Sequence, residues 1–170
     1  MASTLFSDFR PLAAFTVTPQ GQQTLRPLCQ ATGARLHLPA SLPGCEEDIF
    51  YQDPLREYLP QVWSEASGLI FCLATGAVVR LIAPLLQSKD QDPAVVVIDP
   101  QGQFVISLCG GHQGGADRLA QGLAELIGAR AILTGATQAL QLPAIDTLGQ
   151  PWGWGRGNGD WTAVSAVLAR

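Results

Sequence analysis

Apolar runs alternate along this chain with segments in which apolar residues recur every three or four positions. The runs predict strands at 13–17, 35–38, 69–73, 94–98, 104–108 and 131–134. The periodic segments predict helices at 20–29, 54–64, 77–85, 116–127 and, near the end of the chain, 162–169. Alternation of strands and helices predicts an α/β fold, a three-layer α/β/α sandwich with a mostly parallel sheet.

One pair of strands departs from this alternation. The segment 99–103, Asp-Pro-Gln-Gly-Gln, has the composition of a turn and lies between two apolar runs, so we expect a β-hairpin there. The apolar stretch 68–86 is nearly long enough to span a bilayer, but Arg80 lies inside it and Pro84 near its end. A buried strand followed by a helix explains it better, so we expect no membrane contact.

The most unusual segment is a glycine turn between the run at 104–108 and the helix predicted at 116–127. It holds His112, one of two histidines in the chain, and four glycines: Gly110, Gly111, Gly114 and Gly115. Glycine lets a ligand approach the main chain closely, and the free N–H groups of the first helical turn, where Asp117 lies, favour an anion. Many such turns bind nothing, and this one matches neither a dinucleotide fingerprint nor a Walker A motif.

A second candidate site follows the run at 69–73. Thr75 is expected to cap the helix that begins there, with Gly76 beside it. Arg80 is expected on the side of this helix opposite its apolar stripe. Arg80 is either a solvated surface residue or a carboxylate-binding one, since α/β sheets place ligands where a helix opens after a core strand.

Composition narrows the class of protein. The 170 residues suit one domain, and the formal net charge of −4 without a basic run argues against a nucleic-acid surface. The four cysteines are widely spaced, with no metal-binding pattern, and predict reduced, mostly buried thiols in a cytoplasmic protein. Cys109, at the end of a strand, is expected in the core rather than as a nucleophile. His37, in a strand-like run, is expected to be structural.

Three segments together resemble a known family. They are 73–85, LATGAVVRLIAPL; 92–99, DPAVVVID; and 104–116, FVISLCGGHQGGA. Their order and spacing resemble the N-terminal domain of the cobalamin biosynthesis protein CbiG, the cobalt-precorrin-5A hydrolase family. The resemblance is close from Trp63 to Thr137 and looser from Phe15 to Leu38.

The resemblance implies a role in vitamin B12 synthesis: opening the lactone of cobalt-precorrin-5A by water, with loss of acetaldehyde. His112 is then the candidate general base. The candidate substrate-binding residues, chosen on chemical grounds, are Thr75, Gly76, Arg80, Gly110, Gly111, Gly114, Gly115 and Asp117. No cofactor and no metal site is expected in this domain. Any cobalt belongs to the corrinoid substrate, and S-adenosylmethionine enters only where a methyltransferase domain follows.

Two departures from the family pattern matter. The family's usual Ser-Gly-His is here Gly110-Gly111-His112, which excludes a serine nucleophile at position 110. The tail, with PWGW at 151–154 and GDWT at 159–162, resembles the region joining this domain to precorrin-3B carbon-17 methyltransferase in fusion proteins. We therefore expect a domain over 1–148 and a Gly/Trp-rich tail over 149–170, with a downstream domain or other B12-pathway enzymes as partners. The alternative function is a non-catalytic corrinoid-binding domain serving that methyltransferase.

Overall fold

The computed structural model describes residues 6–88, 91–110 and 115–134, together with the isolated residues Trp154, Gly157, Gly159 and Val164. The chain divides into two compact units, 1–132 and 133–170, and the first holds all the elements described below. The predicted tail, its helix at 162–169 and the domain boundary at residue 148 lie outside the described ranges and stay predictions.

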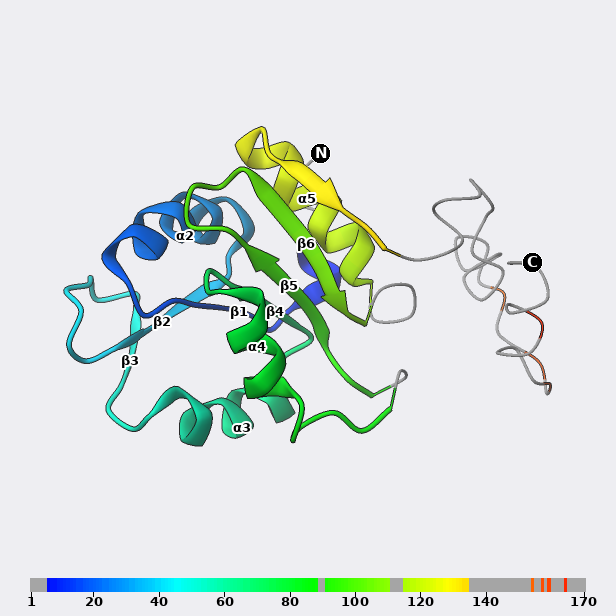
Figure 1. Ribbon diagram of the computed structural model, residues 1–170, viewed down its shortest axis with the longest axis horizontal. Helices are drawn as coiled ribbons and strands as arrows, with labels where there is room; N and C mark the ends of the chain where they lie inside the picture. The colour runs from blue at the N-terminus through cyan, green and yellow to red at the C-terminus, as the bar shows by residue number, and fades with distance from the viewer. Residues whose placement is uncertain are drawn as a thin grey trace. The chain divides into compact units, whose positions relative to one another are not determined.

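The first unit alternates strands and helices, as the hydrophobic pattern predicts (Figure 1). The strands are β1 Leu12–Phe15, β2 Arg35–Pro39, β3 Ile49–Tyr51, β4 Gly68–Phe71, β5 Ala94–Ile98, β6 Phe104–Cys109 and β7 Arg130–Ile132. The helices are the 3₁₀ turn η1 Phe6–Phe9 and the α-helices α2 Pro19–Thr32, α3 Leu55–Glu65, α4 Thr75–Ile82 and α5 Ala116–Ile127.

The seven strands form one sheet in the order β3-β2-β1-β4-β5-β6-β7. All neighbouring strands are parallel except β5 and β6, which are antiparallel and form the predicted hairpin. The predicted α/β class with a mostly parallel sheet is therefore confirmed. β3 is a short edge strand that the hydrophobic pattern did not predict, since only three residues pair with β2.

Helices cover both faces of the sheet, and alternate strand residues face opposite layers. Helices α3 and α4 contact each other on one face, and α2 and α5 on the other. The α3/α4 core combines the side chains Phe15, Leu59, Trp63, Phe71, Val78 and Val97 with their neighbours. On the opposite face, a β-carbon at Gly68 would lie 3.4 Å from Leu119 of α5, so β4 packs closely against this helix.

Three local expectations are corrected. Thr75 does not cap α4: Ala74 is the N-cap residue, Thr75 is the first helical residue, and no side-chain hydrogen bond caps this end. Helix α2 is longer than predicted because Thr18 caps its start and Gly33, at φ +76°, ends it. Of the four cysteines, all free, only Cys72 is fully buried; Cys29 and Cys109 are half-buried and Cys45 is exposed.

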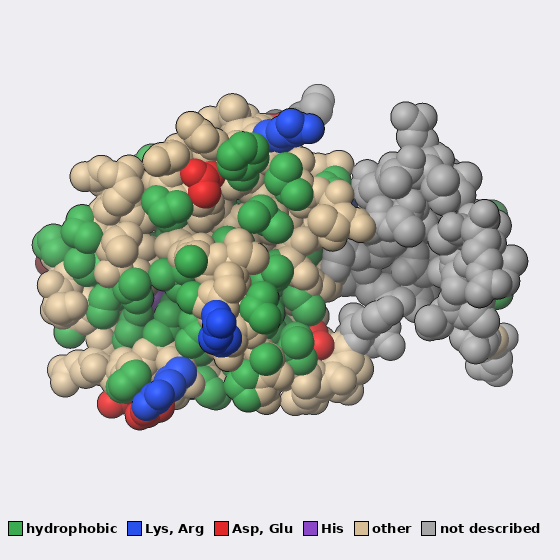
Figure 2. All heavy atoms as spheres, viewed as in Figure 1, with side chains coloured by type: hydrophobic (Ala, Val, Ile, Leu, Met, Phe, Trp, Pro, Cys, Tyr) green, Lys and Arg blue, Asp and Glu red, His purple; other side chains and the backbone are tan. Residues whose placement is uncertain are grey.

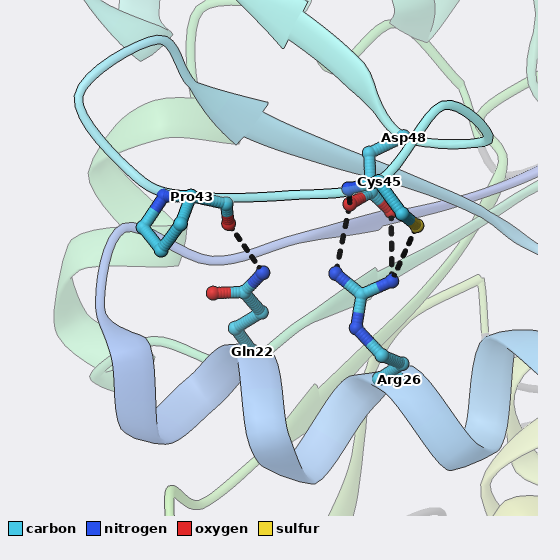
Figure 3. A network of polar contacts seen from close by, with 5 residues as sticks. All are labelled: Gln22, Arg26, Pro43, Cys45 and Asp48. Atoms are coloured by element: carbon cyan, nitrogen blue, oxygen red, sulfur yellow. Dashed lines mark hydrogen bonds and ion pairs between the residues drawn. The ribbon is translucent and has the colours of Figure 1, made fainter.

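A loop between β2 and β3 is fastened to α2 by side chains (Figure 3). Arg26 donates to both carboxylate oxygens of Asp48, at 2.7 and 3.2 Å, and to Sγ of Cys45 at 2.9 Å. Gln22 donates to the carbonyl of Pro43 at 2.6 Å. Burial opposes the charge of the Asp48 carboxyl, but hydrogen bonds from Arg26 and Cys45 outweigh it and lower its pKa.

The ion pair of Arg26 and Asp48 gives a prediction about stability. The Asp48 side chain is only 4% exposed, so Arg26→Ala leaves a buried carboxylate without its cation. We expect a loss of about 2 kcal/mol in the free energy of unfolding, measured by urea denaturation. Arg56→Ala is the control, because its pair with Glu57 is exposed on both sides and is expected to contribute under about 0.5 kcal/mol. Equal losses in the two variants would show that Arg26 does not fasten the loop.

His37 is a buried aromatic residue within the α3 layer, as a structural role requires. Its ring stacks on Phe15 at 4.7 Å between centroids, and Nδ1 lies 2.9 Å from the hydroxyl of Tyr58. Burial, with a smaller effect of Arg35, lowers the pKa of His37 to about 4.

The lowered pKa of His37 predicts that acid weakens the fold before the carboxylates titrate. The unfolded chain takes up a proton below its own pKa of 6.5 that the folded chain refuses down to about 4. The free energy of unfolding should fall by about 3 kcal/mol across that window, then level off for this group. Urea denaturation at several pH values should give a flatter curve for His37→Gln, and identical slopes in both proteins would contradict the assignment.

Candidate functional site

The two turns that the sequence singles out lie at opposite edges of the sheet, that is, at opposite ends of its parallel strands. Thr75 and Gly76 follow the carboxyl end of β4, whereas Gly110 follows β6, which runs the other way. Gly110 has φ +73°, and a β-carbon on it would lie 3.0 Å from the carbonyl oxygen of Pro93, just before β5 begins. The five residues of β5 span about 13 Å, so the structure does not unite these two turns.

The glycine turn is described only at its base. The N–H of Ala116 donates to the carbonyl of Gly110 at 2.9 Å, which closes the turn. Gly115 has φ +77°, and a β-carbon there would lie 2.8 Å from the ring of Phe9, so a larger residue would not fit. Asp117 is buried in the first turn of α5. Gly111, His112 and Gly114 lie outside the described residues, and their roles remain predictions.

Cys109 borders this turn but is poorly suited to be a nucleophile. Burial, with a smaller effect of Asp92, raises the pKa of its thiol, so the thiolate is scarce at neutral pH. Its half-buried side chain packs against the core under α4. Within the described ranges, no group of three or more His, Cys, Asp or Glu side chains is placed to hold a metal ion, and no helix is long and apolar enough to cross a membrane.

Thr75 and Gly76 occupy the place where α/β sheets commonly bind ligands. Strands β1 and β4 are neighbours, and the chain leaves them in opposite directions, from β1 toward β2 and from β4 toward β5. The carboxyl ends of such a strand pair form a topological switch point, where the loops diverge and leave room for a ligand. The first turn of α4 lies at this point.

The first turn of α4 presents hydrogen-bond donors. No side chain caps it, so within the described residues the backbone N–H groups of Thr75 and Gly76 have no acceptor. The exposed side chain of Arg80 folds back along the helix, and its Nη1 donates to the carbonyl of Gly76 at 2.9 Å. A β-carbon at Gly76 would lie 3.4 Å from this Nη1, an ordinary contact, so the guanidinium lies directly against Gly76. Two N–H groups, a hydroxyl and a cation suit a carboxylate.

Helix α2, on the other side of the switch point, is closed by its own residues. The hydroxyl of Thr18 accepts the N–H of Gly21 at 3.1 Å, and Thr16 is fully buried. A β-carbon at Gly21 would collide with the hydroxyl of Thr16. Hydrophobic periodicity does not identify these residues, although the Thr-Val-Thr-Pro at 16–19, directly after a strand, is a signal for a capped helix start.

Comparison with known proteins supports the resemblance found in the sequence. Residues 57–138 match the family model described as cobalamin synthesis G N-terminal. The chain is 40% identical over 110 residues to a cobalt-precorrin-5A hydrolase of Priestia megaterium, covering 64% of this chain and 29% of that protein. It is 50% identical over 88 residues to one of Salmonella typhimurium, covering 52% of this chain and 25% of that protein.

A solved structure shares the fold. It is that of a putative cobalamin biosynthesis protein G homolog from Sulfolobus solfataricus, with a TM-score of 0.56 and 21% identity, covering 72% of this chain and 36% of that one. The chain thus spans less than a third of the length of the curated relatives it matches. The match from residue 57 to 138 agrees with the resemblance from Trp63 to Thr137, and this segment of the chain is identified as a cobalamin synthesis G N-terminal segment.

Proposed function

We propose that this chain acts in cobalamin biosynthesis as part of a cobalt-precorrin-5A hydrolase. Its two curated relatives carry that name at 40% and 50% identity. The observation that carries the proposal here is the uncapped first turn of α4 at the switch point, where the guanidinium of Arg80 lies against the carbonyl of Gly76. Corrinoid intermediates bear many carboxylates, and this turn offers donors for one of them.

In the proposed reaction, water adds to the lactone carbonyl of the corrinoid and the lactone C–O bond breaks, which leaves a carboxylate and a hydroxyl on a two-carbon fragment. That hydroxyl then loses its proton, the C–C bond that joins the fragment to the macrocycle breaks, and the macrocycle takes up the electron pair and a proton as acetaldehyde leaves. Thr75, Gly76 and Arg80 hold a carboxylate and orient the ring. They offer no general base, so the proton from water goes to a group elsewhere, and we assign His112 to it.

We propose that the glycine turn also contacts the substrate. The residues assigned to the substrate there are Gly110, Gly111, Gly114, Gly115 and Asp117. The domain uses no cofactor of its own, since cobalt arrives with the substrate. Further domains or other B12-pathway enzymes are its partners, and its place is the cytoplasm.

Arg80 provides a test of carboxylate recognition. Cobyrinic acid carries the corrin ring with free carboxylates, and cobinamide carries the same ring with amides. We expect Arg80→Gln to weaken binding of cobyrinic acid about tenfold and binding of cobinamide much less, because one charge-assisted hydrogen bond is lost. Absorbance titration measures both. Arg130→Gln, at an exposed arginine on β7, is the control, and equal effects of the two variants would contradict the assignment.

His112 provides the test of catalysis. Incubation with cobalt-precorrin-5A, followed by ring absorbance and by acetaldehyde release, should show both binding and release for the wild-type chain. His112→Ala should retain binding and lose about a hundredfold or more in rate. Binding without release by the wild-type chain would contradict a self-sufficient hydrolase and favour a corrinoid-carrying domain. Undiminished release by His112→Ala would remove this histidine from the mechanism.

A further inference from the structure

The outer face of α4 is apolar and exposed. Val79 is 46% exposed and Leu86, just after the helix, is 43% exposed, with the exposed Ala83 between them. Positions 79 and 83 are one helical turn apart, and Leu86 lies in the turn that follows the helix, where its N–H donates to the carbonyl of Ile82 at 3.2 Å; these three side chains are called the stripe below. Hydrophobic side chains gather over α4 in the space-filling view (Figure 2). By contrast, the exposed residues of α5 are mostly polar: Arg118, Gln121, Glu125 and Leu126.

The charge around this stripe is one-sided. The chain has 14 acidic residues, yet the segment from Leu73 to Ser88 contains none, and its single charged residue is Arg80. The guanidinium of Arg80 is held against the helix by the carbonyl of Gly76, beside the stripe. A surface of this kind favours an occupant that is apolar on its face and negative at its rim.

The stripe also connects the two edges of the sheet. Helix α4 begins at the carboxyl end of β4 and leads back toward the start of β5, where Gly110 lies. At its far end, Leu85 packs against the same core as Leu108 and Cys109 of β6. The eight residues of α4 span about 12 Å, which is comparable with the width of a tetrapyrrole-derived ring.

We propose that one face of the corrinoid macrocycle lies on the stripe of Val79, Ala83 and Leu86, with a peripheral carboxylate on Arg80. This inference rests on the proposed function and deepens it, because it names the surface that holds the ring itself. The ring then extends from the first turn of α4 toward the edge at which β6 ends. The stripe contacts the apolar face of the ring, and Arg80 binds a carboxylate at its rim.

The test separates these two contributions. Binding of cobyrinic acid and of cobinamide to the 170-residue chain is measured by absorbance titration. The double variant Val79→Asn/Leu86→Gln should weaken both ligands about tenfold, because both share the apolar ring. Leu126→Gln is the matched control, since Leu126 is 38% exposed on α5, which covers the face of the sheet opposite to α4. Circular dichroism and urea denaturation establish that each variant is folded.

Each outcome decides between the alternatives. Weaker binding of both ligands by the double variant but not by Leu126→Gln supports the stripe as the surface that holds the ring. Amide NMR shifts confined to the segment around α4 on adding cobinamide would support it independently. Equal affinities of the double variant and Leu126→Gln would overturn the role of the stripe. The proposed function would stand if Arg80→Gln still weakens the binding of cobyrinic acid. Unchanged binding together with lost self-association in sedimentation would assign the stripe to contacts between copies. Absence of binding by the wild-type chain would overturn both the role of the stripe and the proposed function.

Discussion

The turn that joins β5 to β6 sets the direction of β6 and therefore the edge of the sheet at which the glycine turn lies. The carboxylate of Asp99 accepts the backbone N–H groups of Gln101, Gln103 and Phe104, at 3.1, 2.7 and 2.6 Å, and Gly102 adopts φ +67°. Three hydrogen bonds to one carboxylate fix a tight reversal. The carbonyl of the next residue, Pro100, accepts bonds from Gln20 and Thr24 of α2, which ties the turn to the neighbouring layer.

This reversal separates the two turns that the sequence marks as candidate sites, the turn after β4 and the turn after β6. In a sheet of parallel strands joined by helices, the loops after successive strands share one edge, so the turns after β4 and β6 would have been neighbours. Because β6 runs antiparallel to β5, Gly110, directly after the last residue of β6, lies beside Pro93 at the start of β5. Helix α4 spans the interval between the two edges, which gives it a part in the site beyond its first turn.

The division of tasks within the proposed site follows from the chemistry available at each edge. The first turn of α4 has only donors and a cation, so it suits binding an anion but supplies no proton acceptor. Cys109, at the other edge, has a raised pKa and packs into the core. The relatives are more than three times as long as the segments this chain shares with them, so most of each relative lies outside the shared segment.

The sequence by itself determined the strand and helix order apart from β3, the hairpin and the resemblance to the family, because periodicity, the turn composition at 99–103 and three motif segments are local signals. The helix predicted at 116–127 has the bounds of α5, and Gly128 ends it with a left-handed backbone that favours glycine. Only the tertiary structure decided which edge each turn occupies and that Ala74, rather than Thr75, is the N-cap residue of α4. It alone showed Arg80 folded over Gly76 and the apolar stripe left uncovered. Strand direction and helix exposure depend on contacts between distant segments, which local patterns do not encode.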